Sequence, residues 1–242
     1  MAIAPMHANN TPVSKTETWN YSIRYKYGLV VMKAGTAQYR LQIGNYKGKP
    51  AIKSSLYLKT NPFFDKIFVV RDTLTAYATL LDFIPLYHYR AVHEGNTHFS
   101  EEIWTQKFGD DYTELHIKRI ENEKIRIDTL LTASNAAYDL VNIFLYLRQL
   151  DYSDVKPGDN IHITTFLGKK KANLIIRSIK PVVFEGSHKQ QRNAFYLAID
   201  ISNEVFSESK NAIEAWISDD EYHIPLKIKA KLKIGAVEAD LM

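Results

Sequence analysis

Apolar and polar residues alternate along most of the chain, which is the period of a β-strand with one buried face. In the first clear run, Tyr21, Ile23, Tyr25 and Tyr27 alternate with Ser, Arg and Lys. Similar short runs follow, separated by turn-forming Gly, Asn or Asp, as in an antiparallel meander. The further candidate strands are 37–43, 52–58, 73–79, 87–94, 97–106, 161–166, 172–179, 195–201, 212–217, 224–234 and 237–241.

Two interruptions are expected early in the chain. Gly28 and the stretch to Gly35 should separate the first strand from the second. A single helical turn is expected at 61–68, because Asn61 can cap it and Pro62 is tolerated at a first helical position. Further hairpin turns are expected at Gly109-Asp110-Asp111 and at Glu121-Asn122-Glu123.

The period changes between residues 134 and 150. Apolar residues there occupy nearly every side of a helix, so the helix should be buried rather than lie on a surface. Ser134 or Asn135 is a plausible N-cap, and Pro157-Gly158 lies beyond the end. The sequence therefore predicts a mainly β protein, an antiparallel barrel or two curved sheets, with one buried central helix over about 134–150. Residues 17–242 would form one β-rich domain, whose two β halves this helix joins.

Composition and charge narrow the function classes. The chain has 242 residues, 45% of them apolar, and a net charge of +4 that is spread along the sequence. Nucleic-acid binders usually carry a clustered basic face, so nucleic acid is not an expected partner. The strand at 224–234 places Lys227, Lys229, Lys231 and Lys233 on one face, which favours a solvated surface, with an anionic-ligand stripe as the alternative. The absence of cysteine excludes thiolate metal sites, disulfides and thiol catalysis.

The first residues bear on localisation. Residues 1–8 are small and apolar, and the chain turns polar at Asn9. We interpret residues 1–16 as the remnant of a signal peptide, cut near Ala8, followed by a flexible N-terminus; a merely flexible terminus is the alternative. This interpretation predicts an exported, periplasmic protein of a Gram-negative bacterium. No later apolar run is long enough to span a membrane, so no transmembrane segment is expected.

Several landmarks, taken in order, resemble a known family. They are the run 21–27 followed by Lys33-Ala34-Gly35-Thr36-Ala37, Tyr138-Asp139 through Arg148, Lys156-Pro157-Gly158-Asp159, Ala215-Trp216-Ile217-Ser218-Asp219-Asp220, Ile224-Pro225-Leu226 and Ile234-Gly235-Ala236-Val237-Glu238-Ala239. Together they resemble the exported bacterial family of the domain of unknown function 3108 type, from about Trp19 onward. The resemblance implies a periplasmic, β-rich protein and carries no catalytic residues to transfer.

Three landmark residues are candidate ligand contacts: Asp139, Arg148 and Trp216. Trp216 should lie within a strand, and we interpret it as a core anchor. Asp139 and Arg148 are about two and a half helical turns apart, so they face opposite ways and cannot pair with each other. An unpaired charge in so apolar a helix would be costly. Each should therefore find a partner in the surrounding sheet, which makes a structural role the main interpretation and ligand contact the alternative.

The predicted hairpin of residues 87–106 offers candidate metal ligands. Gly95-Asn96 predicts a two-residue turn that sets His93 opposite His98 and Arg90 opposite Glu101, an exposed pair. Glu102 shares a face with the two histidines, so the three are candidate metal ligands. They are an incomplete set for zinc, and a polar hairpin face without metal is the preferred interpretation. No cofactor is expected.

No catalytic motif is present: the sequence lacks a G-x-S-x-G elbow, a phosphate loop, a dinucleotide fingerprint and H-E-x-x-H. Adjacent acids such as Glu101-Glu102 point to opposite faces of a strand, which does not suit paired acid-base chemistry. The sequence favours a noncatalytic envelope protein that binds an apolar or amphipathic, lipid-like ligand or an envelope partner. The alternatives are a hydrolase of envelope polymer and a structural or assembly factor without ligand. A structure would distinguish the three functions. An apolar cavity would support ligand binding, a polar cleft with converging carboxylates would support the hydrolase, and a filled core would support the structural factor.

Overall fold

The structure is a computed structural model that describes residues 16–107, 112–134, 136–152, 160–167, 170–186, 190–203, 209–232 and 234–242. Several sequence features lie outside these ranges: the expected cleavage site near Ala8, the turn at 109–111, Asn135, Lys156-Pro157-Gly158-Asp159 and Lys233.

The described residues form fifteen strands and two short helices. The strands are β1 (Glu17–Tyr27), β2 (Val30–Tyr46), β3 (Lys49–Thr60), β4 (Arg71–Ala78), β5 (Pro85–Glu94), β6 (Thr97–Lys107), β7 (Tyr112–Glu121), β8 (Lys124–Ser134), β9 (Ala137–Tyr138), β10 (Ile161–Leu167), β11 (Lys170–Glu185), β12 (Gln191–Asn203), β13 (Ser209–Ser218), β14 (Pro225–Lys231) and β15 (Ala236–Leu241). The helices are the 3-10 turn η1 (Phe64–Lys66) and the α-helix α1 (Ile143–Gln149). No helix in these ranges is both long and apolar enough to cross a membrane.

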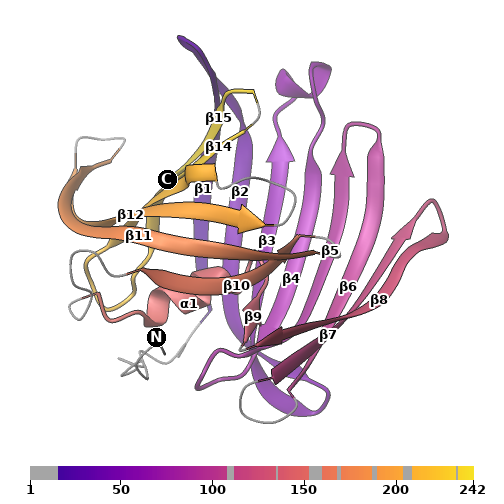
Figure 1. Ribbon diagram of the computed structural model, residues 1–242. Helices are drawn as coiled ribbons and strands as arrows, with labels where there is room; N and C mark the ends of the chain where they lie inside the picture. The colour runs from indigo at the N-terminus through magenta and orange to yellow at the C-terminus, as the bar shows by residue number, and fades with distance from the viewer. Residues whose placement is uncertain are drawn as a thin grey trace.

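All fifteen strands belong to one sheet that curls into a nearly closed barrel. Its order is β8-β7-β6-β5-β4-β3-β2-β1-β15-β14-β13-β12-β11-β10-β9, so β1 joins the two halves of the chain by pairing with β15. Neighbours are antiparallel except β9 and β10, which are parallel. Figure 1 shows β2 to β8 standing side by side, with β10 to β12 crossing in front of them. The prediction of a mainly β barrel is confirmed.

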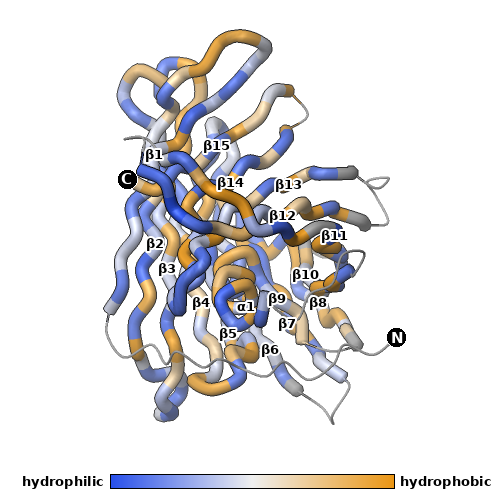
Figure 2. Tube along the Cα trace, turned by 90° about the vertical axis from the view of Figure 1, so that its left-hand side faces the viewer, coloured by the Kyte–Doolittle hydropathy of each residue, from blue (hydrophilic) through white to orange (hydrophobic). Residues whose placement is uncertain are grey.

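The core lies inside the curled sheet, and α1 with the residues that flank it supplies part of the core to each half. Val141 and Leu145 pack with the buried side chains of β1 to β4. Leu147 and Leu150 pack with those of β10 to β13. Figure 2 shows α1, largely hydrophobic with a hydrophilic part, between the two sets of strands. A helix that is apolar on nearly every side is thus buried between two β halves, as predicted.

The helix is much shorter than the predicted 134–150. Residues 137–138 form β9 and pair with Thr164 and Thr165 of β10, and α1 spans only Ile143–Gln149. Apolar residues in this stretch fitted a helix and a short buried strand equally well, because periodicity alone does not separate the two. The N-cap predicted at Ser134 was therefore wrong, since Ser134 ends β8.

The expected break near Gly35 is also wrong, because β2 runs unbroken from Val30. Gly35 lies where β2 and β3 approach closely: a Cβ there would be 2.1 Å from the carbonyl oxygen of Lys59. The register of β1 and β2 shifts at this point, since Ile23 pairs with Gly35 and Arg24 with Lys33. The glycine thus accommodates a bulge within a continuous strand. The helical turn after Asn61 is confirmed as η1, and Asn61 Oδ1 accepts a hydrogen bond from the Phe64 amide at 2.8 Å.

Candidate functional site

An apolar cavity lies between α1 and the inner face of β10 to β14. Its volume is about 160 Å³. One side is formed by residues of α1 and the turn before it, and the other by the strands. The lining residues are Leu140, Ile143, Phe144, Leu147, Thr165, Leu174, Ile199, Ile201, Ile213, Ala215, Ile217 and Ile228. Eleven of the twelve are apolar and none is charged.

Strand alternation builds the sheet side of this cavity. Successive side chains of a strand point to opposite faces, so Ile213, Ala215 and Ile217 of β13 line the cavity while Trp216 points outward. Ala215 lies between Leu197 of β12 and Ile228 of β14 in the sheet register. A small residue between two larger neighbours leaves room that a Leu or Ile would fill.

The cavity opens to solvent beside Leu140, whose side chain is 43% exposed although it is one of the lining residues. Ile143, Phe144 and Ile228 are half-buried, so the mouth is apolar as well as the interior. Phe144 packs edge-to-face on Tyr39 at 5.3 Å between ring centroids.

Thr165 supplies the polar atom of the cavity lining. Its Oγ1 is buried and has no hydrogen-bond partner among the residues that the structure describes. The side chain is 2% exposed. A buried hydroxyl without a partner costs about 1–3 kcal/mol, so a bound molecule with a donor or acceptor near Thr165 would gain a hydrogen bond that the protein does not make itself.

Arg148 has a partner in the sheet, as predicted, whereas the hydrogen bonds of Asp139 come from the backbone that follows it. Arg148 makes two hydrogen bonds to Glu17 of β1, at 2.8 and 3.1 Å. Asp139 precedes α1, and its Oδ1 accepts from the amides of Val141 and Asn142 at 2.8 and 2.9 Å. His88 of β5 places Nδ1 3.2 Å from the same oxygen. The assumption that both charges lie on the helix was wrong for Asp139, but both serve to fix α1 to the first half of the barrel.

Trp216 is not a core anchor. It lies half-buried on the outer face of β13, with its ring 5.2 Å from that of Tyr196 and 5.8 Å from Lys227 Nζ. The sequence places Trp216 in a strand but does not fix which face points inward, and the inward positions are taken by Ala215 and Ile217. Trp216 therefore lies on the opposite face of the sheet from the apolar cavity.

The histidine hairpin has the predicted register. His93 pairs with His98, and the two ring centroids are 3.9 Å apart. Glu102 shares their face but lies four residues beyond His98, about 13 Å along an extended strand. Its carboxylate accepts a hydrogen bond from Tyr87 at 3.0 Å. The structure thus brings the two histidines together and keeps Glu102 apart from them. Within the described ranges, no group of three or more His, Asp or Glu residues could hold a metal ion.

The pairing of Arg90 with Glu101 is confirmed, but the prediction that it is exposed is wrong. The Glu101 side chain is 2% exposed and is held between two arginines. Arg90 Nε donates to it at 2.9 Å and Arg119 Nε at 2.7 Å. Both guanidinium groups also lie over the ring of Phe99, at 5.0 and 4.2 Å from its centroid. Sequence reasoning missed this cluster because the hairpin register shows which residue Glu101 pairs with, but the local sequence does not show that Glu101 is buried.

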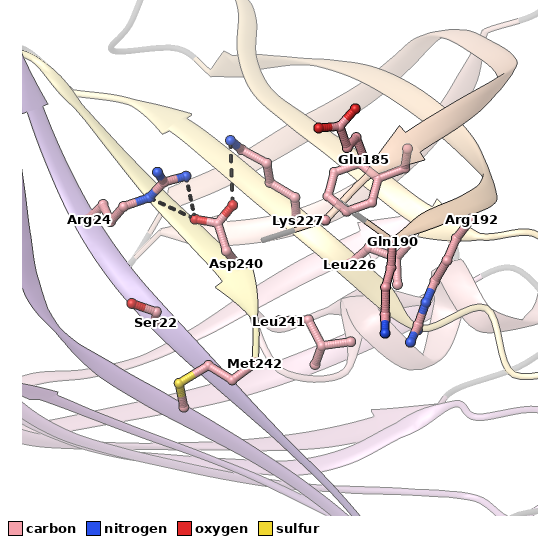
Figure 3. Close-up of a pocket in the computed structure, with 12 residues that line it drawn as sticks. Ser22, Arg24, Glu185, Gln190, Arg192, Leu226, Lys227, Asp240, Leu241 and Met242 are labelled. Atoms are coloured by element: carbon pink, nitrogen blue, oxygen red, sulfur yellow. Dashed lines mark hydrogen bonds and ion pairs between the residues drawn. The ribbon is translucent and has the colours of Figure 1, made fainter. Parts of the chain in front are cut away.

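A larger hollow of about 800 Å³ lies on the outer face, bounded by β1, β14, β15 and the β11–β12 hairpin. Figure 3 shows Arg24 and Lys227 converging on Asp240. Their nitrogen atoms are 2.7 and 3.5 Å from its carboxylate oxygens. These charges neutralise one another, so they offer little to a ligand. The smaller cavity beside α1, which is apolar and carries one unpartnered hydroxyl, is the better candidate for a binding site.

Comparisons with known proteins agree with this architecture. The crystal structure of a β-barrel-like protein of the domain of unknown function DUF1849 from Brucella abortus matches 93% of this chain and 94% of its own, with a TM-score of 0.58. At 8% sequence identity this likeness shows the fold alone. No match is found among curated proteins. The model of the family described as "Protein of unknown function (DUF3108)" matches residues 20–242. The chain therefore belongs to the DUF3108 family.

Proposed function

We propose that this protein is a noncatalytic, exported cell-envelope protein that holds the apolar end of a lipid-like ligand in the cavity beside α1. The observation that carries the proposal is the cavity itself: about 160 Å³, lined by eleven apolar side chains and open at an apolar mouth. An enclosed apolar cavity of about 150 Å³ in another protein stays dry and binds benzene or xenon. This one has room for the end of a hydrocarbon chain, and the rest of the ligand would pass out beside Leu140.

Thr165 adds a chemical preference to this site. Its side chain lines the cavity and its hydroxyl has no partner among the described residues, so a ligand whose hydroxyl, ester or carboxyl oxygen reaches that hydroxyl would bind more tightly than a pure hydrocarbon. The signal-peptide interpretation of residues 1–16 supports an envelope location, where such amphipathic molecules are abundant. A fatty-acid chain or a molecule that contains one is therefore the proposed ligand class.

The test is to fill the cavity and measure binding of a fluorescent polyene fatty acid. Ala215→Leu should reduce binding at least tenfold, because the added carbons occupy the space between Leu197 and Ile228. Ala91→Leu is the matched control, since Ala91 is half-buried on the outer face of β5. Circular dichroism establishes that both variants fold. Equal binding by Ala215→Leu and the native protein would overturn the proposal, and mass spectrometry of a solvent extract of purified protein would identify a ligand retained from the cell.

A further inference from the structure

One end of the barrel carries unusually exposed apolar side chains. Three connections meet there: the β1–β2 turn, the β3–β4 segment that contains η1, and the β14–β15 turn. We call this surface the apolar end. Its most exposed large apolar residues are Leu29 (102%), Ile234 (65%), Phe63 (64%), Ile67 (62%), Tyr27 (60%) and Val30 (53%). Turns normally expose polar residues and glycine, so six exposed apolar side chains in adjacent turns require an explanation.

The three connections form one continuous surface. Tyr25 of β1 donates a hydrogen bond to the carbonyl oxygen of Ile234 at 3.1 Å. The Tyr25 ring also packs edge-to-face on Phe64 of η1, with 6.0 Å between centroids. The amide of Asn61 donates to the carbonyl oxygen of Ala34 in β2 at 2.9 Å. Figure 1 shows the three turns together at the upper end of the barrel, and Figure 2 shows apolar and polar segments interleaved there.

The three connections of the apolar end carry mainly positive charge, and the neighbouring β5–β6 turn adds the exposed Glu94, which forms a β-bridge with Val70. The segments 25–34, 58–71 and 230–237 contain seven Lys or Arg residues and one acid, Asp65. Asp65 is already paired with Arg71 at 2.6 Å. Lys26, Lys59 and Lys66 are exposed beside the apolar tips. The end of the barrel therefore combines projecting apolar side chains with lysines on their flanks.

We propose that the apolar end docks on an anionic lipid bilayer. Separate apolar tips on convex turns can each enter the boundary between headgroups and acyl chains, whereas a protein partner would need a matching pocket for each tip. Lysines at the same level attract the negative surface of the membrane. This is the combination of apolar insertion and basic flanks found in peripheral membrane proteins. The inference rests on the turns alone and holds whether or not the cavity beside α1 takes a ligand.

The experiment is sedimentation of the full chain with vesicles of phosphatidylcholine alone and of phosphatidylcholine with phosphatidylglycerol. The native protein should bind the anionic vesicles at least tenfold more strongly than the neutral ones, and added salt should weaken binding through screening. The triple variant Leu29→Ser, Phe63→Ser, Ile67→Ser should lose at least tenfold of the anionic-vesicle binding. Lys26→Gln combined with Lys66→Gln should reduce binding and its salt dependence.

The matched control is Leu81→Ser. Leu81 is 69% exposed but lies in the β4–β5 turn, at the opposite end of the barrel, so its substitution should leave vesicle binding unchanged. Failure of the native protein to bind anionic vesicles would overturn the proposal. Concentration-dependent dimerisation that the triple variant abolishes, without vesicle binding, would also overturn it, because the apolar end would then join two copies of the chain. Fatty-acid binding measured on the triple variant separates this result from the cavity, since it should be unchanged.

Discussion

Glu101 gives the sharpest test of how this barrel is held together. The carboxylate is buried on the inner face of β6 and accepts from Arg90 of β5 and Arg119 of β7. The negative charge of Glu101 thus links three adjacent strands and partly neutralises the two guanidinium groups. Replacement by Gln keeps the size of the side chain and removes the charge, which leaves two like charges facing each other across the strand.

The expected cost follows from burial. Removing one partner of a buried ion pair costs about 3–5 kcal/mol, because the remaining charge stays buried without compensation. The side chains of Arg90 and Arg119 are 20% and 21% exposed, so water can solvate them in part. Glu101→Gln should therefore lower the free energy of unfolding by about 3 kcal/mol, at the lower end of that range.

Urea denaturation at neutral pH measures this change, with an unchanged m-value as the sign that the native state is preserved. Glu121→Gln is the matched control on the neighbouring strand, because Glu121 and Arg126 are 3.8 Å apart and their side chains are 39% and 51% exposed. That substitution should cost under about 1 kcal/mol. If both variants lost an equally small amount of unfolding free energy, the reasoning would be refuted. Glu101 would then behave as an exposed residue, as the sequence analysis predicted.

Three further predictions concern α1, the cavity and the outer ion pairs. Leu145→Ala should cost about 2–5 kcal/mol in urea denaturation because Leu145 is 1% exposed, and Phe144→Ala should cost less because its ring lines the open cavity. Thr165→Val should raise the free energy of unfolding by about 1 kcal/mol by removing an unpartnered hydroxyl, and a loss would show that the hydroxyl has a partner. The pKa of Glu238 is lowered because, although burial opposes ionisation, the Lys227 hydrogen bond and nearby positive charges outweigh it. Its stabilisation is complete above the unfolded pKa of about 4.3 and is lost as the pH falls through the folded pKa, so Glu238→Gln should narrow the difference in unfolding free energy between about pH 7 and pH 3.

Much of the fold was predictable because local rules determine it. The Gly95-Asn96 turn fixes the pairing of His93 with His98 without any knowledge of the rest of the chain. The hydrogen bond from the Phe64 amide to Asn61 is local in the same sense, and η1 forms within the expected range 61–68, although it is shorter and its N-cap is Phe63. Alternation identified most strands, since a barrel buries one face of each strand. These features depend on neighbours within a few residues, which the sequence shows directly.

Features that depend on distant parts of the chain were not predictable in the same way. Trp216 was placed in the right strand, but its outward orientation depends on which face of β13 meets α1. The burial of Glu101 depends on how strongly the whole sheet curls. Residues 137–138 form a strand because β10 offers a pairing edge, and nothing within 134–150 indicates that edge. The cavity itself depends on the distance between α1 and Ala215, which no local pattern encodes.

The position of the cavity follows from how α1 is anchored. At one end Asp139 accepts from the first amides before the helix and lies beside His88 of β5, and at the other Arg148 binds Glu17 of β1. Both charged anchors thus attach α1 to the first half of the barrel. Toward β10 to β14 the side chains of the helix meet apolar side chains, and contacts between such side chains are not directional. A hydrogen-bond contact to this half, 3.0 Å from His223 Nδ1 to the carbonyl oxygen of Arg148, lies at the C-terminal end of the helix. A ligand chain can therefore separate α1 from Ala215 on that side without breaking an ion pair, which explains why the apolar space occurs there rather than between α1 and β1.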